Sequence, residues 1–373
     1  MRILHVITTL DIGGAEKQLL SLAKQQTKCG NSVVVIPIKG ESELAPEFAE
    51  AGIEVIQRIT NRDVITQIFG LNNIIKTRNF DVVHSHLPRA QILTAFALEG
   101  NSKLIVTRHD AMAFFSKGNK WVSKLLWRIV QWKSARVIVI SQSILKGMIE
   151  RGEAIDLEKI GVVYYGIELE DHQVWQRSTS QIEKAIDSVG RGKFIFGTVS
   201  RLVEEKNIEL LIEAFAKLHT RHTNTALIIV GYGPLGSMLS EKAKSLGVSK
   251  AVLFAGKQLN ASEWMQKFDA FILASKTEGF GLVLLEAMRA GLPIIASDVD
   301  AIPEVLSNRG GLLFNPESAT ELTEKMSLIL KSEIRSSLVK KSRARLQKFT
   351  ITQSEMNVRR VYDKALTKNY QSH

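Results

Sequence analysis

The sequence predicts an α/β protein of two domains, each built on a doubly wound parallel β-sheet, that face each other across a cleft. The chain has 373 residues, more than one hydrophobic core usually serves. Short β-branched runs alternate with helical patterns, as is typical of parallel strands covered by helices on both faces. The alternation stops at a polar stretch from about 168 to 193 and then restarts, which indicates a second sheet.

Five strands are predicted on each side of the polar stretch. Those of the first half are ILHVITT near the start, SVVVIPI at 32–38, DVVHSH at 81–86, KLIVTRH at 103–109 and RVIVIS at 136–141. Those of the second half are FIFGTVS, ALIIVG, VLFAG, AFILAS and PIIASD. We expect one domain at 1–168 and another at 169–351, with a last helix at about 352–373 that packs back on the first domain. Ligands of open parallel sheets bind beyond the carboxyl ends of the strands, so we look for functional residues in the loops that follow them.

The composition is that of an ordinary globular protein, with 45% hydrophobic and 23% charged residues. Cys29 is the single cysteine, so the chain forms no internal disulfide and has no cysteine cluster for zinc. We interpret the N-terminal run as a strand rather than a signal peptide, and no stretch of about 18 apolar residues predicts a membrane span. We therefore expect a cytoplasmic protein.

The formal net charge of +11 favours polyanionic partners. Six basic residues and no acidic one occur between 115 and 136, together with three tryptophans. This pattern suits an anionic membrane interface, such as the inner face of the plasma membrane. The alternative is an ordinary helix whose tryptophans pack on their own sheet. We do not expect nucleic acid as a partner, because no recognised binding module accompanies the charge. The basic residues and tryptophans are Lys117, Lys120, Lys124, Arg128, Lys133, Arg136, Trp121, Trp127 and Trp132.

The most informative segment runs from Ser275 to Pro293 and follows the predicted strand AFILAS. Its glycine-containing turn leads into a helix, which offers unpaired backbone N–H groups to an anion. Glu278 lies in the turn and Glu286 inside the helix, so the two carboxylates could bind different hydroxyls of one elongated ligand. The alternative is a solvated helix residue and a first-turn acid that favours the helix dipole.

Two further loops after predicted strands carry candidate residues. Arg201 and Lys206 follow FIFGTVS, where a guanidinium and an ammonium could neutralise a diphosphate without a metal ion. The alternative is two solvated surface bases. Gly13 and Gly14 follow the first strand and let the backbone approach a ligand closely. The run lacks the GxGxxG pattern, so a dinucleotide site is not supported.

Histidines cluster at two strand ends in the first half of the chain. His109 ends the strand KLIVTRH and precedes Asp110. A lone histidine is more often structural than catalytic, although this position favours function. We expect His84 and His86 to point in opposite directions from their strand, so that they cannot chelate a metal ion together. We interpret both as packing or acceptor-side residues.

The run EGFGLVLLEAMRAGLPIIAS, with Glu278 and Glu286 separated by seven residues, resembles the paired-glutamate signature of the retaining GT-B glycosyltransferases, glycosyltransferase family 4 in particular. The resemblance implies two Rossmann-like domains, with the sugar-donor site mainly in the second. It implies that Glu278 contacts sugar hydroxyls and that Glu286 holds the nucleotide ribose. It also assigns sugar and diphosphate contacts to the turn and helix start, namely Gly279, Phe280, Gly281 and Leu282.

Other positions match the same family in order. The resemblance assigns the donor diphosphate to Arg201 and Lys206, and it brings the loop of Gly14 to that diphosphate from the first domain. It assigns base or ribose contacts to the glycine turn after ALIIVG and a binding and transition-state role beside the sugar to His109. The turn residues are Gly231 and Tyr232.

The chain departs from the family in one place. Where the family often has an Asn-Gly pair near the end of the first domain, this chain has Tyr164-Tyr165-Gly166-Ile167. We expect the turn to be kept through Gly166, whereas the side-chain contact of the asparagine is lost. Tyr165 is therefore not included among the predicted site residues.

The resemblance implies a retaining, metal-independent transfer of a sugar from a nucleotide-diphosphate sugar, with a UDP-sugar as first candidate, to a hydroxyl acceptor. No other cofactor is expected. A saccharide or lipid-linked saccharide, as in lipopolysaccharide or other envelope polysaccharide synthesis, is the expected acceptor. The catalytic set would be His109, Arg201, Lys206 and Glu278. Two alternatives remain open, a sugar-nucleotide 2-epimerase of the same architecture and a catalytically silent partner in an assembly.

Overall fold

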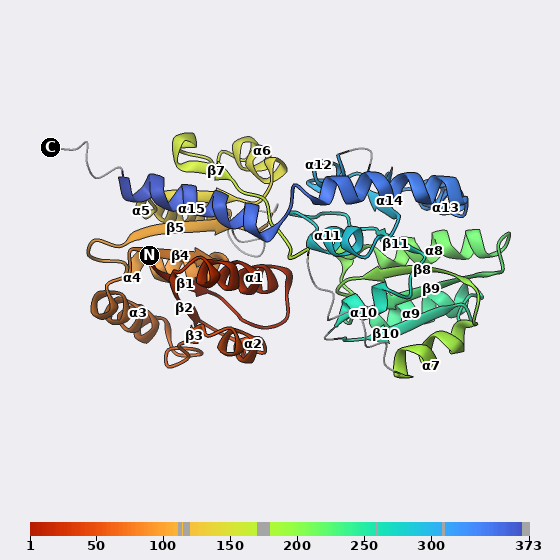
Figure 1. The fold of residues 1–373 in the computed structure, drawn as a ribbon, viewed down its shortest axis with the longest axis horizontal. Helices are drawn as coiled ribbons and strands as arrows, with labels where there is room; N and C mark the ends of the chain where they lie inside the picture. The colour runs from red at the N-terminus through yellow and green to blue at the C-terminus, as the bar shows by residue number, and fades with distance from the viewer. Residues whose placement is uncertain (111–113, 115–119, 170–179, 259, 308–309, 368–373) are drawn as a thin grey trace. The chain divides into compact units, whose positions relative to one another are not determined.

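The structure is a computed structural model that describes residues 1–110, 114, 120–169, 180–258, 260–307 and 310–367 (Figure 1). The chain divides into two compact units. The first consists of Met1–Glu168 together with Phe349–His373, and the second of Leu169–Lys348. Each unit contains one parallel sheet with helices packed against it, which confirms the predicted pair of doubly wound α/β folds.

The sheet of the first unit has seven parallel strands in the order β3-β2-β1-β4-β5-β6-β7. Its central strands are buried at nearly every position, as is typical of parallel strands covered by helices on both faces. β3 and β7 were not predicted, because two and three residues are too few to show a pattern. The strands are β1 (Arg2–Ile7), β2 (Ser32–Pro37), β3 (Glu54–Val55), β4 (Val82–His86), β5 (Lys103–Arg108), β6 (Arg136–Val139) and β7 (Ile160–Val162).

Helices connect these strands, and local signals set several of their starts. The carboxylate of Asp63 accepts a hydrogen bond from Thr66 N at 2.9 Å, and Pro88 opens the helix after β4. The helices are α1 (Gly14–Lys28), α2 (Ala45–Glu50), α3 (Val64–Arg78), α4 (Pro88–Ala97), α5 (Lys120–Lys133), α6 (Gln142–Glu150), η1 (Leu157–Lys159) and α15 (Ile351–Thr367).

The C-terminal helix α15 belongs to the first unit although 180 residues of the second unit precede its segment. It contacts α1, β5 and β6, as can be followed from its blue ribbon in Figure 1. Its buried side chains Ile351, Val358 and Tyr362 join the cluster formed by strand residues such as Ile3 and Ile105. The helix therefore completes one hydrophobic layer of the first sheet.

The second unit has a sheet of six parallel strands in the order β10-β9-β8-β11-β12-β13. Its strands are β8 (Phe194–Val199), β9 (Thr225–Val230), β10 (Val252–Gly256), β11 (Ala270–Leu273), β12 (Ile294–Ser297) and β13 (Leu312–Phe314). Its helices are α7 (Ser180–Val189), η3 (Glu204–Lys206), α8 (Ile208–His219), α9 (Gly236–Ser245), α10 (Ala261–Met265), α11 (Leu282–Arg289), α12 (Ile302–Leu306), α13 (Ala319–Ile329) and α14 (Ser332–Leu346).

Both sheets have a point where the strand order reverses, between β1 and β4 in the first unit and between β8 and β11 in the second. Helices that leave neighbouring strands on opposite sides open a crevice at such a point, and ligands of doubly wound sheets bind there. The loops after these four strands therefore mark where each unit can bind a ligand. Among the described residues, no helix combines the length and apolar character needed to cross a membrane.

Candidate active site

An ion pair occupies the reversal point of the second sheet. Lys206, at the end of η3 after β8, places its Nζ 2.6 Å from Oε2 of Glu278, in the turn after β11. Both side chains are largely buried, with 18% and 16% exposed. The Ser275 hydroxyl donates to the same carboxylate oxygen at 3.3 Å. The structure thus brings together two predicted residues that are 72 positions apart in the chain.

A carboxylate from the next loop holds the Glu278 turn in place. Oδ2 of Asp300 accepts hydrogen bonds from Glu278 N at 2.8 Å and from the Thr277 hydroxyl at 2.6 Å. Asp300 follows β12, the neighbour of β11 in the sheet. Sequence analysis missed this residue, although an acid that follows an adjacent predicted strand is a signal that could have found it.

The turn enters α11 through Gly281, whose φ of 82° is a left-handed conformation that favours glycine. Gly281 has no side chain with which to cap the helix, and the first N–H groups of a helix have no partner within it. Phe280 is buried and anchors the turn in the core. Leu282 begins the helix, and Glu286 is four residues further, on the same face.

Three other predicted residues of this unit lie at the same edge of the sheet, with different exposure. Gly279 is half-buried between Glu278 and Phe280, and Glu286 is half-buried on α11. Arg201 is exposed on the loop after β8. Within the described part of the chain, no hydrogen bond or ion pair joins Arg201 to Lys206 or Glu278. The structure therefore assembles Lys206 with Glu278 and leaves Arg201 on the neighbouring surface.

The predicted glycine turn after β9 lines an open pocket of about 500 Å³. Tyr232 O accepts a hydrogen bond from Leu202 N at 2.9 Å, which ties this turn to the loop after β8. Gly231 has a φ of 140°, and a Cβ there would lie 1.8 Å from Ser200 O. Only glycine permits this approach. The Tyr232 ring is 58% exposed at the pocket, with the Lys257 ammonium 5.4 Å from its centre.

In the first unit, the loop after β1 ends at the start of α1. The Glu16 carboxylate accepts a hydrogen bond from the Thr9 hydroxyl at 2.7 Å, and its other oxygen lies only 2.3 Å from where a Cβ on Gly13 would be. A Cβ on Gly14, by contrast, would meet nothing within 4 Å. A side chain at position 13 would displace the Glu16 carboxylate, whereas Gly14 faces open space.

His109, the predicted residue at the end of β5, is held through both ring nitrogens. Its Nε2 is 3.1 Å from Nδ1 of His86, and its Nδ1 contacts the Tyr165 hydroxyl in a short hydrogen bond. Burial, followed by the positive charge of Arg108, lowers the pKa of His109 to about 3. The imidazole is therefore neutral at physiological pH.

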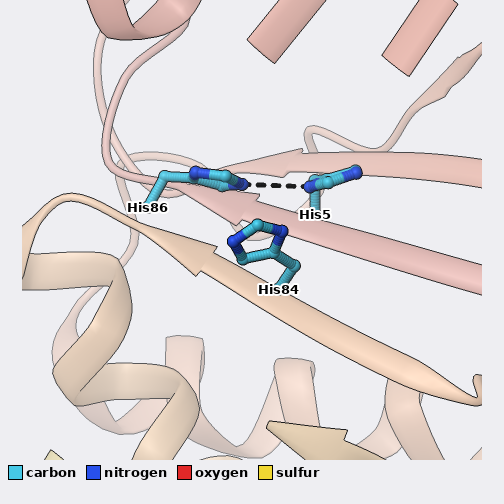
Figure 2. A group of neighbouring side chains, drawn as sticks. All are labelled: His5, His84 and His86. Atoms are coloured by element: carbon cyan, nitrogen blue, oxygen red, sulfur yellow. Dashed lines mark hydrogen bonds between the residues drawn. The ribbon is translucent and has the colours of Figure 1, made fainter. Parts of the chain in front are cut away.

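The expectation that His84 and His86 point in opposite directions is wrong. Residues two apart in a strand point to the same face of the sheet, and the ring centres of these two residues are 4.2 Å apart. His5, which pairs with His84 in the register of β1 and β4, adds a third ring. Figure 2 shows the three rings gathered in one place. A histidine within an otherwise apolar strand, as in ILHVI, was the available signal for His5.

This histidine cluster is the one group of three or more potential metal ligands found among the described residues, with one nitrogen of each ring within 4.8 Å of the others. Hydrogen bonds already use both nitrogens of all three rings. His5 binds Gln26 and His86, His84 binds Tyr362 and Thr107, and His86 binds His5 and His109. The three rings thus form a hydrogen-bonded network with one another and with their neighbours.

The sequence YYGI, which replaces the Asn-Gly pair of the family, has a structural role in the first unit. Tyr165 is buried and bonds to His109, so it supplies a side-chain contact that sequence analysis left out. A Cβ on Gly166 would lie 2.3 Å from Thr350 O. Glycine thus lets this segment run beside the start of α15, where Ile167 N donates to Phe349 O at 2.9 Å.

The basic, tryptophan-bearing stretch forms α5 from Lys120 onward, whereas Lys117 lies outside the described residues. Trp127 is fully buried, and its Nε1 donates to Glu153 O at 2.9 Å, as the packing alternative predicts. Trp121 and Trp132 are instead 83% and 76% exposed. One tryptophan therefore anchors the helix, and two lie on its outer surface.

Two family models match the chain. One, described as Glycosyltransferase Family 4, matches residues 12–171, and one, described as Glycosyl transferases group 1, matches residues 180–351. The N-acetyl-alpha-D-glucosaminyl L-malate synthase of Bacillus anthracis is 28% identical over 266 residues, which are 70% of this chain and 68% of that protein. The phosphatidylinositol N-acetylglucosaminyltransferase GPI3 subunit of Saccharomyces cerevisiae is 26% identical over 326 residues, which are 84% of this chain and 71% of that protein.

A solved structure supports the same fold. The crystal structure of Anabaena HepE in complex with UDP-glucose has a TM-score of 0.81 at 21% identity, covering 97% of this chain and 99% of that chain. Each of the two units of this chain carries one of the matched domains, and the two matches together span most of the sequence. The chain therefore belongs to the GT-B glycosyltransferases, with a family 4 domain followed by a group 1 domain.

Proposed function

We propose that this glycosyltransferase is a retaining, metal-independent enzyme that moves a sugar from a nucleotide-diphosphate sugar, with a UDP-sugar as first candidate, to a hydroxyl of a saccharide or lipid-linked acceptor. The Lys206–Glu278 pair at the reversal point of the second sheet carries the proposal. Relatives point the same way, since one similar structure holds UDP-glucose and one similar protein is named for N-acetylglucosamine transfer to phosphatidylinositol.

The second unit offers complementary charges for such a sugar donor. Lys206 and Arg201 would receive the diphosphate together with the N–H groups that begin α11, while Glu278 would accept hydrogen bonds from sugar hydroxyls and Glu286 from the ribose. Gly14, where a Cβ would meet nothing within 4 Å, is proposed as a further contact of the diphosphate. Preorganised charges of this kind stabilise a leaving dianion better than water does.

A retaining transfer breaks one bond and forms one bond at the anomeric carbon of the donor sugar. The bond between the anomeric carbon and the phosphate oxygen breaks, and the acceptor oxygen forms its new bond on the same face of the sugar. The acceptor proton passes to the departing phosphate oxygen, so no separate base is required. The neutral ring of His109 fits a contact with the sugar and not a charged role.

A donor panel and two substitutions test the proposal. UDP-, GDP- and ADP-sugars are added to the purified full-length protein, and the preferred donor raises its melting temperature. Glu278→Gln and Lys206→Ala should each lower kcat/KM about a hundredfold. Lys276→Ala, in the same loop but exposed, is the matched control. Wild-type turnover in Lys206→Ala, an inverted product by NMR, or strict dependence on a divalent ion would contradict the proposal.

We further propose that α5 binds the surface of an anionic membrane, on the cytoplasmic side where nucleotide sugars are supplied. Trp121, Leu125 and Trp132 are exposed and lie within about 40° of one another around the helix. Arg128 lies on the same side, and Lys133 is also exposed. Indole rings prefer the headgroup boundary, and basic side chains prefer anionic lipid, so this face matches a lipid acceptor's environment.

Vesicle sedimentation tests the membrane contact. We expect the full-length protein to bind phosphatidylglycerol vesicles more than phosphatidylcholine vesicles, and less as salt increases. The double substitution Trp121→Ser and Trp132→Ser should abolish this binding. Phe69→Ser, an exposed aromatic on α3, controls for surface hydrophobicity, and Lys340→Gln with Lys341→Gln controls for charge. Equal binding by the tryptophan double variant and the wild type would overturn the proposal.

A further inference from the structure

A continuous chain of side-chain hydrogen bonds runs through the core of the first unit to His109. Gln26 Oε1 is 2.8 Å from His5 Nε2, and His5 Nδ1 is 3.0 Å from His86 Nε2. His86 Nδ1 is 3.1 Å from His109 Nε2, and His109 Nδ1 contacts the Tyr165 hydroxyl. Figure 2 shows the central bond between His5 and His86. The chain of bonds links α1, β1, β4 and the end of β5 to the segment that follows β7.

The amide of Gln26 sets the direction of every bond in this chain. Its oxygen can only accept, so His5 Nε2 carries the proton, and His5 Nδ1 must then accept from His86. By the same logic His86 Nδ1 accepts from His109 Nε2, and His109 Nδ1 accepts from Tyr165. In this orientation of the amide, Gln26 Nε2 donates to the Tyr362 hydroxyl at 3.3 Å.

This logic requires neutral imidazoles, and the surroundings keep them neutral. Burial is the main cause that lowers the pKa of His5 to about 4 and those of His84 and His86 well below their usual value. The titratable and charged groups around His109 are the other rings of the network, Arg108 and Asp110 next to it in the chain, and two phenols on the segments that pack against it. These groups are His5, His84, His86, Arg108, Asp110, Tyr165 and Tyr362.

We propose that His86, supported by His5, is a positioning residue that holds His109 as the Nε2–H tautomer with its Nδ1 directed at Tyr165. This proposal rests on the proposed function for its effect on turnover, because that function places His109 beside the sugar. The ring of His109 then neither rotates nor takes up a proton at the pH of the reaction. A histidine ring keeps one orientation when its ring nitrogens have fixed hydrogen-bond partners. The ring of His109 at the end of β5 therefore keeps the same orientation toward the substrate.

Two substitutions of His86 separate this role from a merely structural one. In His86→Asn the amide oxygen takes the place of Nδ1 and still accepts from His109. In His86→Gln the amide nitrogen takes the place of Nε2 and keeps the bond to His5, but the acceptor for His109 is lost. Both variants are similar in polarity, so they serve as matched controls for each other.

Nuclear magnetic resonance of the unliganded, histidine-labelled full-length protein provides the primary measurement. The wild type and His86→Asn should show His109 as the Nε2–H tautomer with no titration between pH 5 and 8, whereas His86→Gln should give a mixture of tautomers and a higher pKa. Titration of wild-type His109 within this range, or an unchanged tautomer in His86→Gln, would overturn the proposal. If His86→Gln fails to fold, the titration of wild-type His109 still decides the proposal.

Transferase assays give a second, separable measurement. The kcat of His86→Gln should fall about tenfold to a hundredfold, the scale expected when a group beside the substrate is misplaced, and its pH profile should gain an acidic limb. The KM for the sugar donor and the activity of His86→Asn should change little. A wild type without transferase activity would contradict the proposed function, and the resonance data would still decide whether His86 fixes the tautomer of His109.

Discussion

At the scale of single residues, the candidate site depends on contacts between loops that are distant in sequence. Glu278 reaches Lys206 with its side chain, while its own backbone N–H is held by Asp300. A carboxylate that accepts two hydrogen bonds stabilises a turn more than the intrinsic conformational preferences of the turn residues do. The position of Glu278 therefore depends on an acid from the next strand's loop.

Replacement of this acid tests that dependence. Asp300→Ala removes the acceptor of both Glu278 N and the Thr277 hydroxyl, so the turn should loosen and the KM for the sugar donor should rise about tenfold, as expected for lost hydrogen bonds to a charged group. Asp298→Ala, an exposed acid on the same loop, is the control. Steady-state kinetics with the preferred donor measure both. Equal KM values in the two variants would show that Asp300 does not position Glu278.

At the scale of elements, the loops after β8 and β9 are in direct backbone contact and together form one continuous surface. Leu202 N donates to Tyr232 O, and Gly231 passes against Ser200 O. These two loops line the pocket of about 500 Å³ in the second unit. The shape of that pocket therefore depends on a backbone approach that only glycine allows.

A pair of glycine substitutions tests this dependence. Gly231→Ala introduces both an unfavourable backbone angle and a clash, so it should lower the free energy of unfolding by about 1–3 kcal/mol or more and weaken nucleotide binding. Gly236→Ala lies in the same pocket lining but within α9, where the new Cβ would meet Leu202 Cδ1 at an ordinary 3.6 Å. It should be neutral or slightly stabilising. Urea unfolding curves check the pair, and similar losses in both variants would contradict the interpretation.

At the scale of the whole molecule, the two units differ in how they should respond to acid. In the first unit His5, His84 and His86 are buried and His109 is half-buried, and the pKa values of all four are lowered, to about 4 for His5 and about 3 for His109. The unfolded chain protonates these imidazoles near pH 6.5. Below that value the unfolded state binds protons that the folded state does not, so the stability present above pH 6.5 is lost as pH falls.

The free energy of unfolding should fall by about 1.4 kcal/mol per pH unit for each histidine. For His5 this fall should continue until the pH reaches its folded-state pKa of about 4. Hydrogen exchange at pH 7, 6 and 5, corrected for intrinsic rates, should therefore show protection falling faster in β1 and β4 than in β8 and β9. His222→Gln, an exposed histidine of the second unit, should not change this difference. Equal acid sensitivity of the two sheets would refute the prediction.

Local sequence patterns were enough to predict the fold class, the ten longer strands and most of the loops that carry candidate residues. Runs of β-branched residues and glycine turns are local signals, and a parallel sheet puts the carboxyl ends of its strands on one edge. The position of Lys206 and Glu278 after strands was therefore predictable. The three shortest strands, β3, β7 and β13, were not predicted, because two or three residues carry no pattern.

Which side chains meet became clear only in the folded chain. The neighbours of β1 and β8 are set by strand order, which no local pattern encodes, and that order creates the Lys206–Glu278 pair and brings His5 beside His84 and His86. The contacts of Tyr165 with His109 and of Tyr362 with His84 likewise join segments 56 and 278 residues apart. Hydrogen-bond partners across such separations depend on the packing of whole sheets and helices, and a linear sequence states only which groups are available to form them.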